Sequence, residues 1–163
     1  VYLFDRVDNV DLPSVTWDYQ FPMDAFGREL VDTDVEKGLT FLRNAKYRPK
    51  ELFPLTDWSR HVMSYQYGRN PDYIKYTEFR YIDNPVWILK QRIIIKGERV
   101  HIICVEDGET WGLIIRSPSL ARSMESMFYL QWQTAIPLTE EIVKSWGENK
   151  FFAEEKIRKR TIK

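Results

Sequence analysis

The chain has 163 residues, 44% of them hydrophobic and 29% charged, which suits a single domain large enough to bury a core. Lys plus Arg and Asp plus Glu both number 24, so the formal net charge of zero excludes a general attraction to nucleic acid or anionic membranes, while it allows a local charged patch. Aromatic residues reach 15%. We assign most of them to the core and expect the rest to supply contact surface.

Cysteine and histidine are scarce. Cys104 is the only cysteine, which excludes an internal disulfide and favours a cytoplasmic location. With one cysteine and the separated His61 and His101, the sequence does not predict a structural zinc site, and we expect neither metal nor cofactor. No apolar run approaches the roughly 20 residues of a membrane span, so no membrane partner is expected. A start at Val1 rather than Met is expected of a piece of a longer protein.

The pattern predicts the α+β class, as a single domain over residues 1–163. Residues 1–33 are predicted to form an irregular or extended lead, which is too aromatic for a disordered tail and is expected to pack on the domain or on a second copy. Residues 34–70 are predicted to be helical. Within them, a first helix ends at Arg48-Pro49, and a second runs from Leu55 to Tyr67 with Thr56 or Asp57 as its cap.

Residues 75–116 are predicted to form an antiparallel four-stranded meander packed against helices. The predicted strands are Tyr76–Ile82, Val86–Leu89 joined to Arg92–Ile95 by a bend, Val100–Val105 and Trp111–Ile115. Lys96-Gly97-Glu98 is predicted as the turn of one hairpin. Asp107-Gly108 is a stronger hairpin signal, because glycine tolerates the positive φ of a type I′ turn.

Residues 117–163 are predicted to be helical. Ser117 is a good N-cap followed by a proline at the first helical position, and the helix is expected to run to about Ala135. We assign one stripe of this helix to the core: Leu120, Met124, Met127, Phe128, Gln131, Trp132 and Ala135. Another helix is expected from Thr139 to Gly147, and residues 150–163 have a helical composition.

The sequence shows no recognisable catalytic motif. Cys104 lies in an apolar run, which predicts a buried, inert thiol, and His101 is expected on the opposite face of the same strand. Asp72 with Glu78 and Arg80 resembles a metal-dependent nuclease site only faintly, and a surface Glu–Arg pair explains it better. No phosphate-binding glycine loop and no calcium loop occurs. No catalytic residue is therefore predicted.

The stretch from Phe79 to Leu138 carries a resemblance to a known family. Its features are a strand ending in RYID, the segment IIIKGERVHII, an acidic turn, WGLIIRSPSLA, and a helix ending in MFYLQWQTAIPL. This order resembles the C-terminal half of phospholipase-D-like domains, above all the effector-sensing version in archaeal regulators of the TrmB type. The resemblance implies a sensor of small molecules such as sugars, and a dimer.

The catalytic motif of that family is missing. Its histidine, lysine and aspartate would fall on Leu89, Gln91 and Lys96, so the resemblance implies a degenerate, non-enzymatic member. Residues 1–70 do not show the winged helix-turn-helix that such regulators carry. DNA contact would therefore come only through a part that is not in this chain.

Our leading hypothesis is a non-catalytic ligand-sensing domain of a transcriptional regulator. Its expected partners are a small polar molecule, sugar-like or phosphorylated, and a second copy of the chain in a homodimer. The candidate ligand-binding residues offer stacking faces and bidentate donors: Tyr67, Arg69, Arg80, Trp87, Trp111 and Arg116. Two alternatives stay open. One is an interaction or dimerisation module that uses the aromatic residues of 17–26, and the other is a nucleic-acid-processing enzyme with an unrecognised site.

Overall fold

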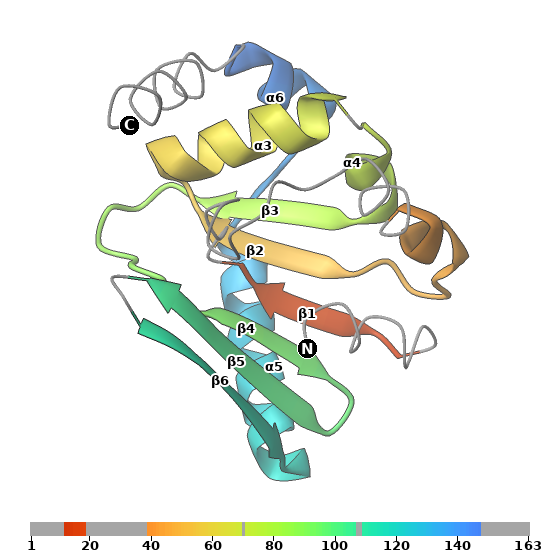
Figure 1. The fold of residues 1–163 in the computed structure, drawn as a ribbon, viewed down its shortest axis with the longest axis vertical. Coiled ribbons are helices and arrows are strands. Elements are labelled where there is room, and N and C mark those ends of the chain that lie inside the picture. Colours follow the sequence, from red (N-terminus) through yellow and green to blue (C-terminus); the bar gives the residue numbers. More distant parts are fainter. Residues whose placement is uncertain (1–11, 19–38, 70, 107–108, 148–163) are drawn as a thin grey trace, which may run out of the picture.

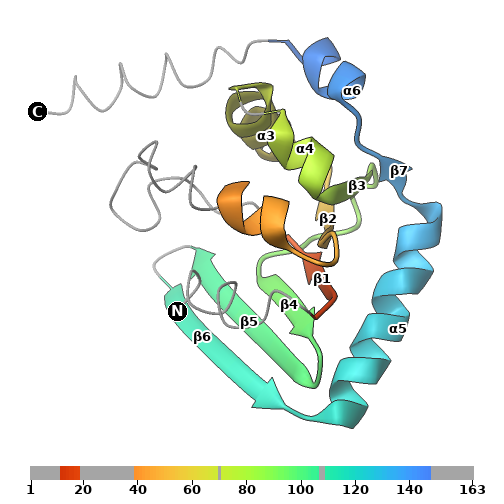
Figure 2. The same ribbon diagram turned by 90° about the vertical axis from the view of Figure 1, so that its right-hand side faces the viewer.

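The computed structural model describes residues 12–18, 39–69, 71–106 and 109–147. They form a seven-stranded mixed sheet with the strand order β6-β5-β4-β1-β2-β3-β7 and helices on both faces (Figures 1 and 2). The strands are β1 Ser14–Trp17, β2 Lys50–Pro54, β3 Glu78–Ile82, β4 Arg92–Lys96, β5 Arg99–Glu106, β6 Glu109–Arg116 and β7 Ile136–Pro137. The helices are α3 Asp57–Arg69, α4 Asp72–Tyr76, α5 Pro118–Thr134 and α6 Glu140–Ser145, and residues 39–44 are also helical. The expected α+β class is confirmed.

The sheet contains the expected meander together with a parallel part. β4, β5 and β6 pair antiparallel, and Gly97 takes a positive φ of 58° in the turn between β4 and β5. β1 pairs antiparallel with β4 but parallel with β2, and β2 pairs parallel with β3. The first predicted strand therefore exists as β3, but β1 and β2 separate it from β4. The sheet thus has seven strands where four were expected.

Two of these strands, β2 and β7, lie where the sequence predicted other structure. β1 lies in the lead that we expected to be irregular or extended, whereas β2 lies within residues 34–70, which we expected to be helical. Four of the five residues of β2 are buried, so the strand has no exposed face and no alternation of buried and exposed residues that could reveal it. β7 has two residues, lies between the helix expected to end near Ala135 and the one expected from Thr139, and pairs with β3.

The predicted strand Val86–Leu89 does not form. The side chain of Asn84 accepts a hydrogen bond from the Val86 N–H at 3.0 Å, and the Asn84 carbonyl accepts one from Trp87 N–H at 3.0 Å. These bonds close a turn directly after β3. The β-branched and aromatic residues that suggested a strand belong to the loop between β3 and β4.

One face of the sheet packs against α5 (Figure 2). The Ser117 hydroxyl accepts a hydrogen bond from the Leu120 N–H at 3.3 Å, which confirms the predicted cap. Phe128 is fully buried, and its ring lies 5.3 Å from those of Trp17 and Trp132. Trp17, which we had placed in a possible aromatic contact surface, is thus a core residue, and residues 19–26 lie outside the described part. Met127 was wrongly assigned to the core, because it is 54% exposed on the adjacent face of the helix.

The other face packs against α3 and α6 at the β3 end of the sheet. A second core forms there from Phe53, Met63, Phe79, Tyr81, Leu138 and Val143. As predicted, Thr56 caps α3 by accepting a hydrogen bond from the Ser59 N–H at 3.0 Å. The side chain of Thr139 caps α6 by accepting a hydrogen bond from the Ile142 N–H. In the described part of the chain, no helix is long and apolar enough to cross a membrane.

Candidate functional site

The sheet face opposite α5 changes from apolar to polar along the strand order. Side chains that are paired across neighbouring strands point to the same face, so the register fixes which residues share it. At the β3 end the face carries the second core, but over β2, β1, β4, β5 and β6 it carries a run of polar residues. These are Ser14, Thr16, Asp18, Glu51, Arg92, Lys96, Arg99, His101 and Arg116, and the same register places Ile94, Ile103 and Ile114 among them. This polar face is the part of the molecule best suited to recognise a ligand.

A buried charge cluster occupies the middle of the polar face. The guanidinium of Arg92 lies 3.2 Å from a carboxylate oxygen of Asp18 and 3.7 Å from one of Glu51. All three side chains are less than 10% exposed. They come from β4, from the end of β1 and from β2, so the cluster joins the meander to the parallel part of the sheet. Removal of either the cation or the carboxylates would leave the opposite charge buried without this ion-pair contact, so we assign the cluster a structural role.

A pocket of about 300 Å³ lies at the end of the same face, beside the β4–β5 turn. It is lined by Leu12, Lys96, Gly97, Glu98, Arg99, His101 and Arg116. His101 is buried at 4% exposure, whereas Glu98 and Arg99 are exposed. Gly97 has a positive φ of 58° and packs closely against Leu12, since a Cβ added there would lie 3.2 Å from the Leu12 side chain. The pocket is therefore formed by one hairpin, the next strand and a residue that precedes β1.

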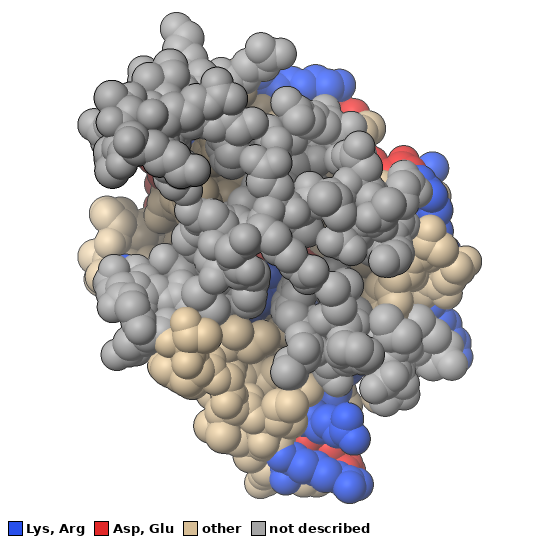
Figure 3. All heavy atoms as spheres, in the orientation of Figure 1, with Lys and Arg blue, Asp and Glu red and all other residues tan. Residues whose placement is uncertain are grey.

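The charged lining of this pocket is mainly cationic. In the strand register, Lys96 lies opposite Arg99, and Arg99 lies opposite Arg116. Three cations therefore form a row across β4, β5 and β6. Among the lining residues that the structure describes, Glu98 is the one carboxylate, and its oxygen lies 3.5 Å from a guanidinium nitrogen of Arg116 in an exposed ion pair. Figure 3 shows Lys and Arg side chains gathered around an acidic one at the lower end of the molecule, over the β4–β5 turn. The chemistry of this lining is suited to binding an anion.

The structure describes the side chains of four of the six predicted site residues, and it does not bring these four together. Of the four, Arg116 alone lines the pocket. Trp87 is half-buried against the core under α5, and Trp111 lies on β6 with 43% exposure, on the face opposite Arg116. Tyr67 and Arg69 lie on α3, and their side chains are outside the described part.

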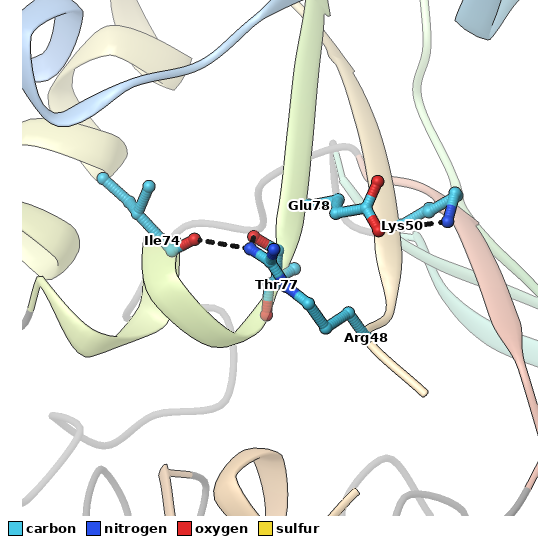
Figure 4. Close-up of polar contacts among 5 residues, drawn as sticks. All are labelled: Arg48, Lys50, Ile74, Thr77 and Glu78. Atoms are coloured by element: carbon cyan, nitrogen blue, oxygen red, sulfur yellow. Dashed lines mark hydrogen bonds and ion pairs between the residues drawn. The ribbon is translucent and has the colours of Figure 1, made fainter. Parts of the chain in front are cut away.

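Arg80 contacts the C-terminal end of α5. Its guanidinium donates to the carbonyl oxygens of Trp132 at 2.8 Å and Ala135 at 3.4 Å. The expectation of a Glu78–Arg80 surface pair is thereby corrected, because Glu78 instead pairs with Lys50 across the β2–β3 register at 3.2 Å (Figure 4). We therefore assign Arg80 a structural contact with the helix end.

Arg48 makes a comparable contact at α4. Its guanidinium donates to the carbonyl oxygens of Ile74 at 3.1 Å and Thr77 at 3.3 Å, where α4 ends and β3 begins (Figure 4). Carbonyls at the end of a helix lack partners within the helix, and a guanidinium supplies them with donors. Arg48 therefore fixes the connection between α4 and β3.

Sequence reasoning missed Lys96, Arg99 and His101 as site residues. The sequence did contain a signal for two of them. In a hairpin that turns at Gly97-Glu98, Lys96 and Arg99 must lie opposite each other on the two strands. Asp18, Glu51 and Arg92 gave no such signal, since their meeting depends on β1 and β2. As expected, Cys104 is buried, and the register places His101 on the other face of β5.

The acidic, histidine and cysteine side chains of the described residues do not form a metal site. Across residues 12–18, 39–69, 71–106 and 109–147, no three of them come together in a way that could hold a metal ion. Asp18 and Glu51 converge on Arg92, a cation, in the manner of an ion-pair network.

Comparison with known proteins gives a likeness of fold. No protein-family model and no curated protein matches the sequence. Among solved structures the fold is similar to that of TrmBL2, described as an archaeal chromatin protein with a novel mode of DNA binding, with a TM-score of 0.54 at 13% identity. The match covers 84% of this chain and 48% of TrmBL2, so the chain spans about half the length of that protein. At the level of the fold, this likeness agrees with the sequence resemblance to TrmB-type regulators. It does not test the resemblance to phospholipase-D-like domains.

Proposed function

We propose that this chain is a non-catalytic regulatory domain of a transcriptional regulator, and that it senses a small polar ligand. The observation that carries the proposal is the pocket at the β4–β5 turn, with a volume of about 300 Å³ and a lining of charged side chains around a buried histidine. The fold shared with TrmBL2, a protein whose described role is in chromatin, supports the regulatory context. DNA would be contacted by a part outside this chain, as the net charge of zero also favours.

The size of the pocket favours a small metabolite. Ligand pockets commonly measure about 300–1,000 Å³, so this one lies at the small end of the range. Four of its seven lining residues come from the single segment Lys96–Arg99, which is a tight turn between two paired strands. A ligand there would contact β4, β5 and β6 together and would reach α5 through Arg116, which directly precedes the cap of that helix. Ligand binding could in this way alter the packing of α5 on the sheet.

A thermal-stability screen of the chain tests the proposal. Sugars, sugar phosphates and nucleotides would be added one at a time, and a ligand at about 100 times its dissociation constant should stabilise the fold by about 2.7 kcal/mol. Arg116→Ala should reduce the response. Arg122→Ala, which removes an exposed arginine of α5 outside the pocket, should leave it unchanged. A screen in which no compound shifts the midpoint, or in which both variants respond equally, would contradict the proposal.

A second candidate role is homodimerisation through β6, which the exposure of that strand favours. Among the described strands, β6 is at the edge of the sheet, and it exposes Trp111 at 43%, Leu113 at 48% and Ile114 at 54%. An edge strand of this kind is a template for pairing with another strand. If two copies paired antiparallel about Gly112, Trp111 of each would face Leu113 of the other, and no side chain would crowd the two-fold axis.

Light scattering after gel filtration would test the dimer. Leu113→Lys should convert a dimer into a monomer, because it places a charge in the interface. The control Met127→Lys places the same charge at a residue of α5 that is 54% exposed. A wild-type chain that stays monomeric at high concentration, or a Leu113→Lys variant that stays dimeric, would exclude this interface.

A further inference from the structure

The turn between β4 and β5, which lines the pocket, is hydrogen-bonded to the start of α5. The carbonyl oxygen of Glu98 accepts a hydrogen bond from the Ser117 N–H at 3.0 Å. A side-chain contact lies beside it, since a carboxylate oxygen of Glu98 is 3.5 Å from a guanidinium nitrogen of Arg116. Gly97 and Glu98 form the turn, and both line the pocket. One pocket residue, Glu98, thus contacts the two residues that directly precede α5.

Ser117 joins this turn to the helix through three of its polar groups. Its N–H donates to the turn, its hydroxyl accepts from the Leu120 N–H at 3.3 Å, and its carbonyl oxygen accepts from the Ala121 N–H at 2.9 Å. The first N–H groups of a helix have no partner within the helix, so their order depends on the cap. The first turn of α5 contains no acidic residue that could interact favourably with the helix dipole. Its conformation therefore depends on where the β4–β5 turn holds Ser117.

The core contacts of α5 are unevenly distributed along its length. α5 runs from the end of β6 to β7 (Figure 2). Its C-terminal part contains the buried rings of Phe128 and Trp132, stacked at 5.3 Å, and Arg80 donates to the carbonyl oxygen of Trp132 at 2.8 Å. In residues 118–127, Ala121 is the one buried side chain, and two further residues are partly buried against the core. Movement of this N-terminal part would therefore expose less apolar area than movement of the C-terminal part.

We infer that residues 118–127 of α5 are the segment through which the pocket acts, and that Ser117 transmits the position of the β4–β5 turn to them. This inference rests on the proposed ligand-sensing role and names how a bound ligand is reported. A ligand that moves the turn displaces the carbonyl of Glu98, so Ser117 follows it or loses the hydrogen bond. In both cases the first turn of α5 shifts or frays, while Arg80 keeps the other end of the helix on β3. The linkage is reciprocal, so the order of this turn changes ligand affinity by the same factor.

Two glycines offer matched variants that strain the backbone without any ligand. Gly97 has a φ of 58°, and Gly147, just after α6, has a φ of 76°, so an alanine is strained at either position. Gly97→Ala distorts the turn of the pocket, where the added Cβ would also lie 3.2 Å from the side chain of Leu12. Gly147 does not line the pocket, so Gly147→Ala is the control for strain alone.

Hydrogen exchange of the full chain, followed amide by amide, measures the effect. At the amides of Leu120 and Ala121, Gly97→Ala should speed exchange about five- to thirtyfold more than Gly147→Ala does, the factor expected for one strained residue. The amide of Ala135, which donates to the Gln131 carbonyl at 3.1 Å, should exchange equally in the two variants. If Gly97→Ala does not fold, Gly97→Asn and Gly147→Asn replace the pair, because asparagine tolerates a positive φ better.

A second test combines changes at the turn and at the cap. Ser117→Ala removes the capping hydroxyl but keeps the N–H that donates to Glu98. Because both changes loosen the same turn of α5, the addition of Gly97→Ala to Ser117→Ala should change its exchange by much less than the product of the two single effects. Ser117→Asp keeps a capping oxygen, and in that background Gly97→Ala should act as it does in the wild type.

The outcomes separate this inference from the proposed function. Faster exchange at the start of α5 in Gly97→Ala but not in Gly147→Ala supports the inference. Equal exchange there in the two variants, or fully multiplicative effects of the two changes, would overturn it and leave the sensing role in place. A thermal screen in which no compound binds would overturn the sensing role, whereas the exchange comparison uses no ligand and decides separately whether the turn and the helix are coupled.

Discussion

The guanidinium of Arg80 on β3 lies over the indole ring of Trp132 on α5, with 4.9 Å between the guanidinium carbon and the ring centroid. The same guanidinium donates to the main-chain carbonyl of Trp132 at 2.8 Å. One side chain thus makes a cation–π contact and a charged hydrogen bond to the last turn of a helix, whose carbonyls lack partners within the helix. Arg80 therefore attaches the C-terminal end of α5 to the sheet.

Replacement of Arg80 should lower stability without affecting ligand binding. Arg80→Met keeps much of the apolar stem but removes the donors, and it should lower the free energy of unfolding by about 1–3 kcal/mol. Arg80→Lys keeps the charge but not the planar arrangement of donors. Its free energy of unfolding should therefore lie between those of the wild type and Arg80→Met. Urea unfolding and ligand titration of the folded variants would measure both effects. A loss of ligand affinity at unchanged stability would return Arg80 to the binding site that the sequence suggested.

The buried cluster around Arg92 should contribute far more than an exposed ion pair does. Arg92→Met leaves the carboxylates of Asp18 and Glu51 buried without their cation, which should cost about 3–5 kcal/mol. Arg116→Met breaks an exposed pair with Glu98 and should change stability by less than about 1 kcal/mol. Chemical denaturation of both variants gives the comparison. Similar costs for the two would mean that water reaches the cluster around Arg92.

The parts of the fold that sequence reasoning predicted well are those determined by local chemistry. The caps at Ser117 and Thr56 and the turn at Gly97 each depend on one residue and its near neighbours, and all three are confirmed. β1 and β2 could not be predicted in this way. They are short, buried on both faces and joined in parallel, so their pairing depends on contacts between residues about 35 positions apart.

The candidate site was predicted less well than the fold. Arg116 was chosen because of its residue type, and it does line the pocket, but Arg80 was chosen for the same reason and contacts a helix end. Residue type alone does not separate an arginine that faces a cavity from one that binds carbonyls. The decisive fact is the register of β4, β5 and β6, which aligns Lys96, Arg99 and Arg116. The hairpin at Gly97 predicts that Lys96 lies opposite Arg99. That Arg116 lies opposite Arg99 depends on the register between β5 and β6, which the sequence does not give.

Two neighbouring residues of α5 provide a test of which face of the helix carries the core. Phe128 is fully buried between Trp17 and Trp132, so Phe128→Ala should cost about 3–5 kcal/mol through lost burial and a cavity. Met127 is 54% exposed, and Met127→Ala should stay within about 0.5 kcal/mol of the wild type. Thermal and urea unfolding of the two variants would measure the difference. A large cost at Met127 would show that a second surface covers this face in solution.

The start of α6 should respond to pH through Glu141. A hydrogen bond from the side chain of Thr139 holds the pKa of Glu141 below its ordinary value of 4.5, with smaller contributions from the Glu141 main chain and Lys144. Since the pKa is lower in the folded state than in the unfolded one, the stabilisation is fully present above about pH 4.5 and is lost as the pH falls through the folded value. Glu141→Gln should remove this pH-dependent increment.

Unfolding free energies measured at neutral pH and near pH 3 would test this, and the difference between the wild type and Glu141→Gln should be largest at neutral pH and should shrink in acid. Thr139→Ala removes the hydroxyl that donates to Glu141, so it should abolish the same increment while it also weakens the cap of α6 at every pH. The increment is small, because Glu141 is fully exposed and salt screens its interactions. A variant that keeps the whole acid-dependent loss of stability would place the responsible carboxylate elsewhere in the chain.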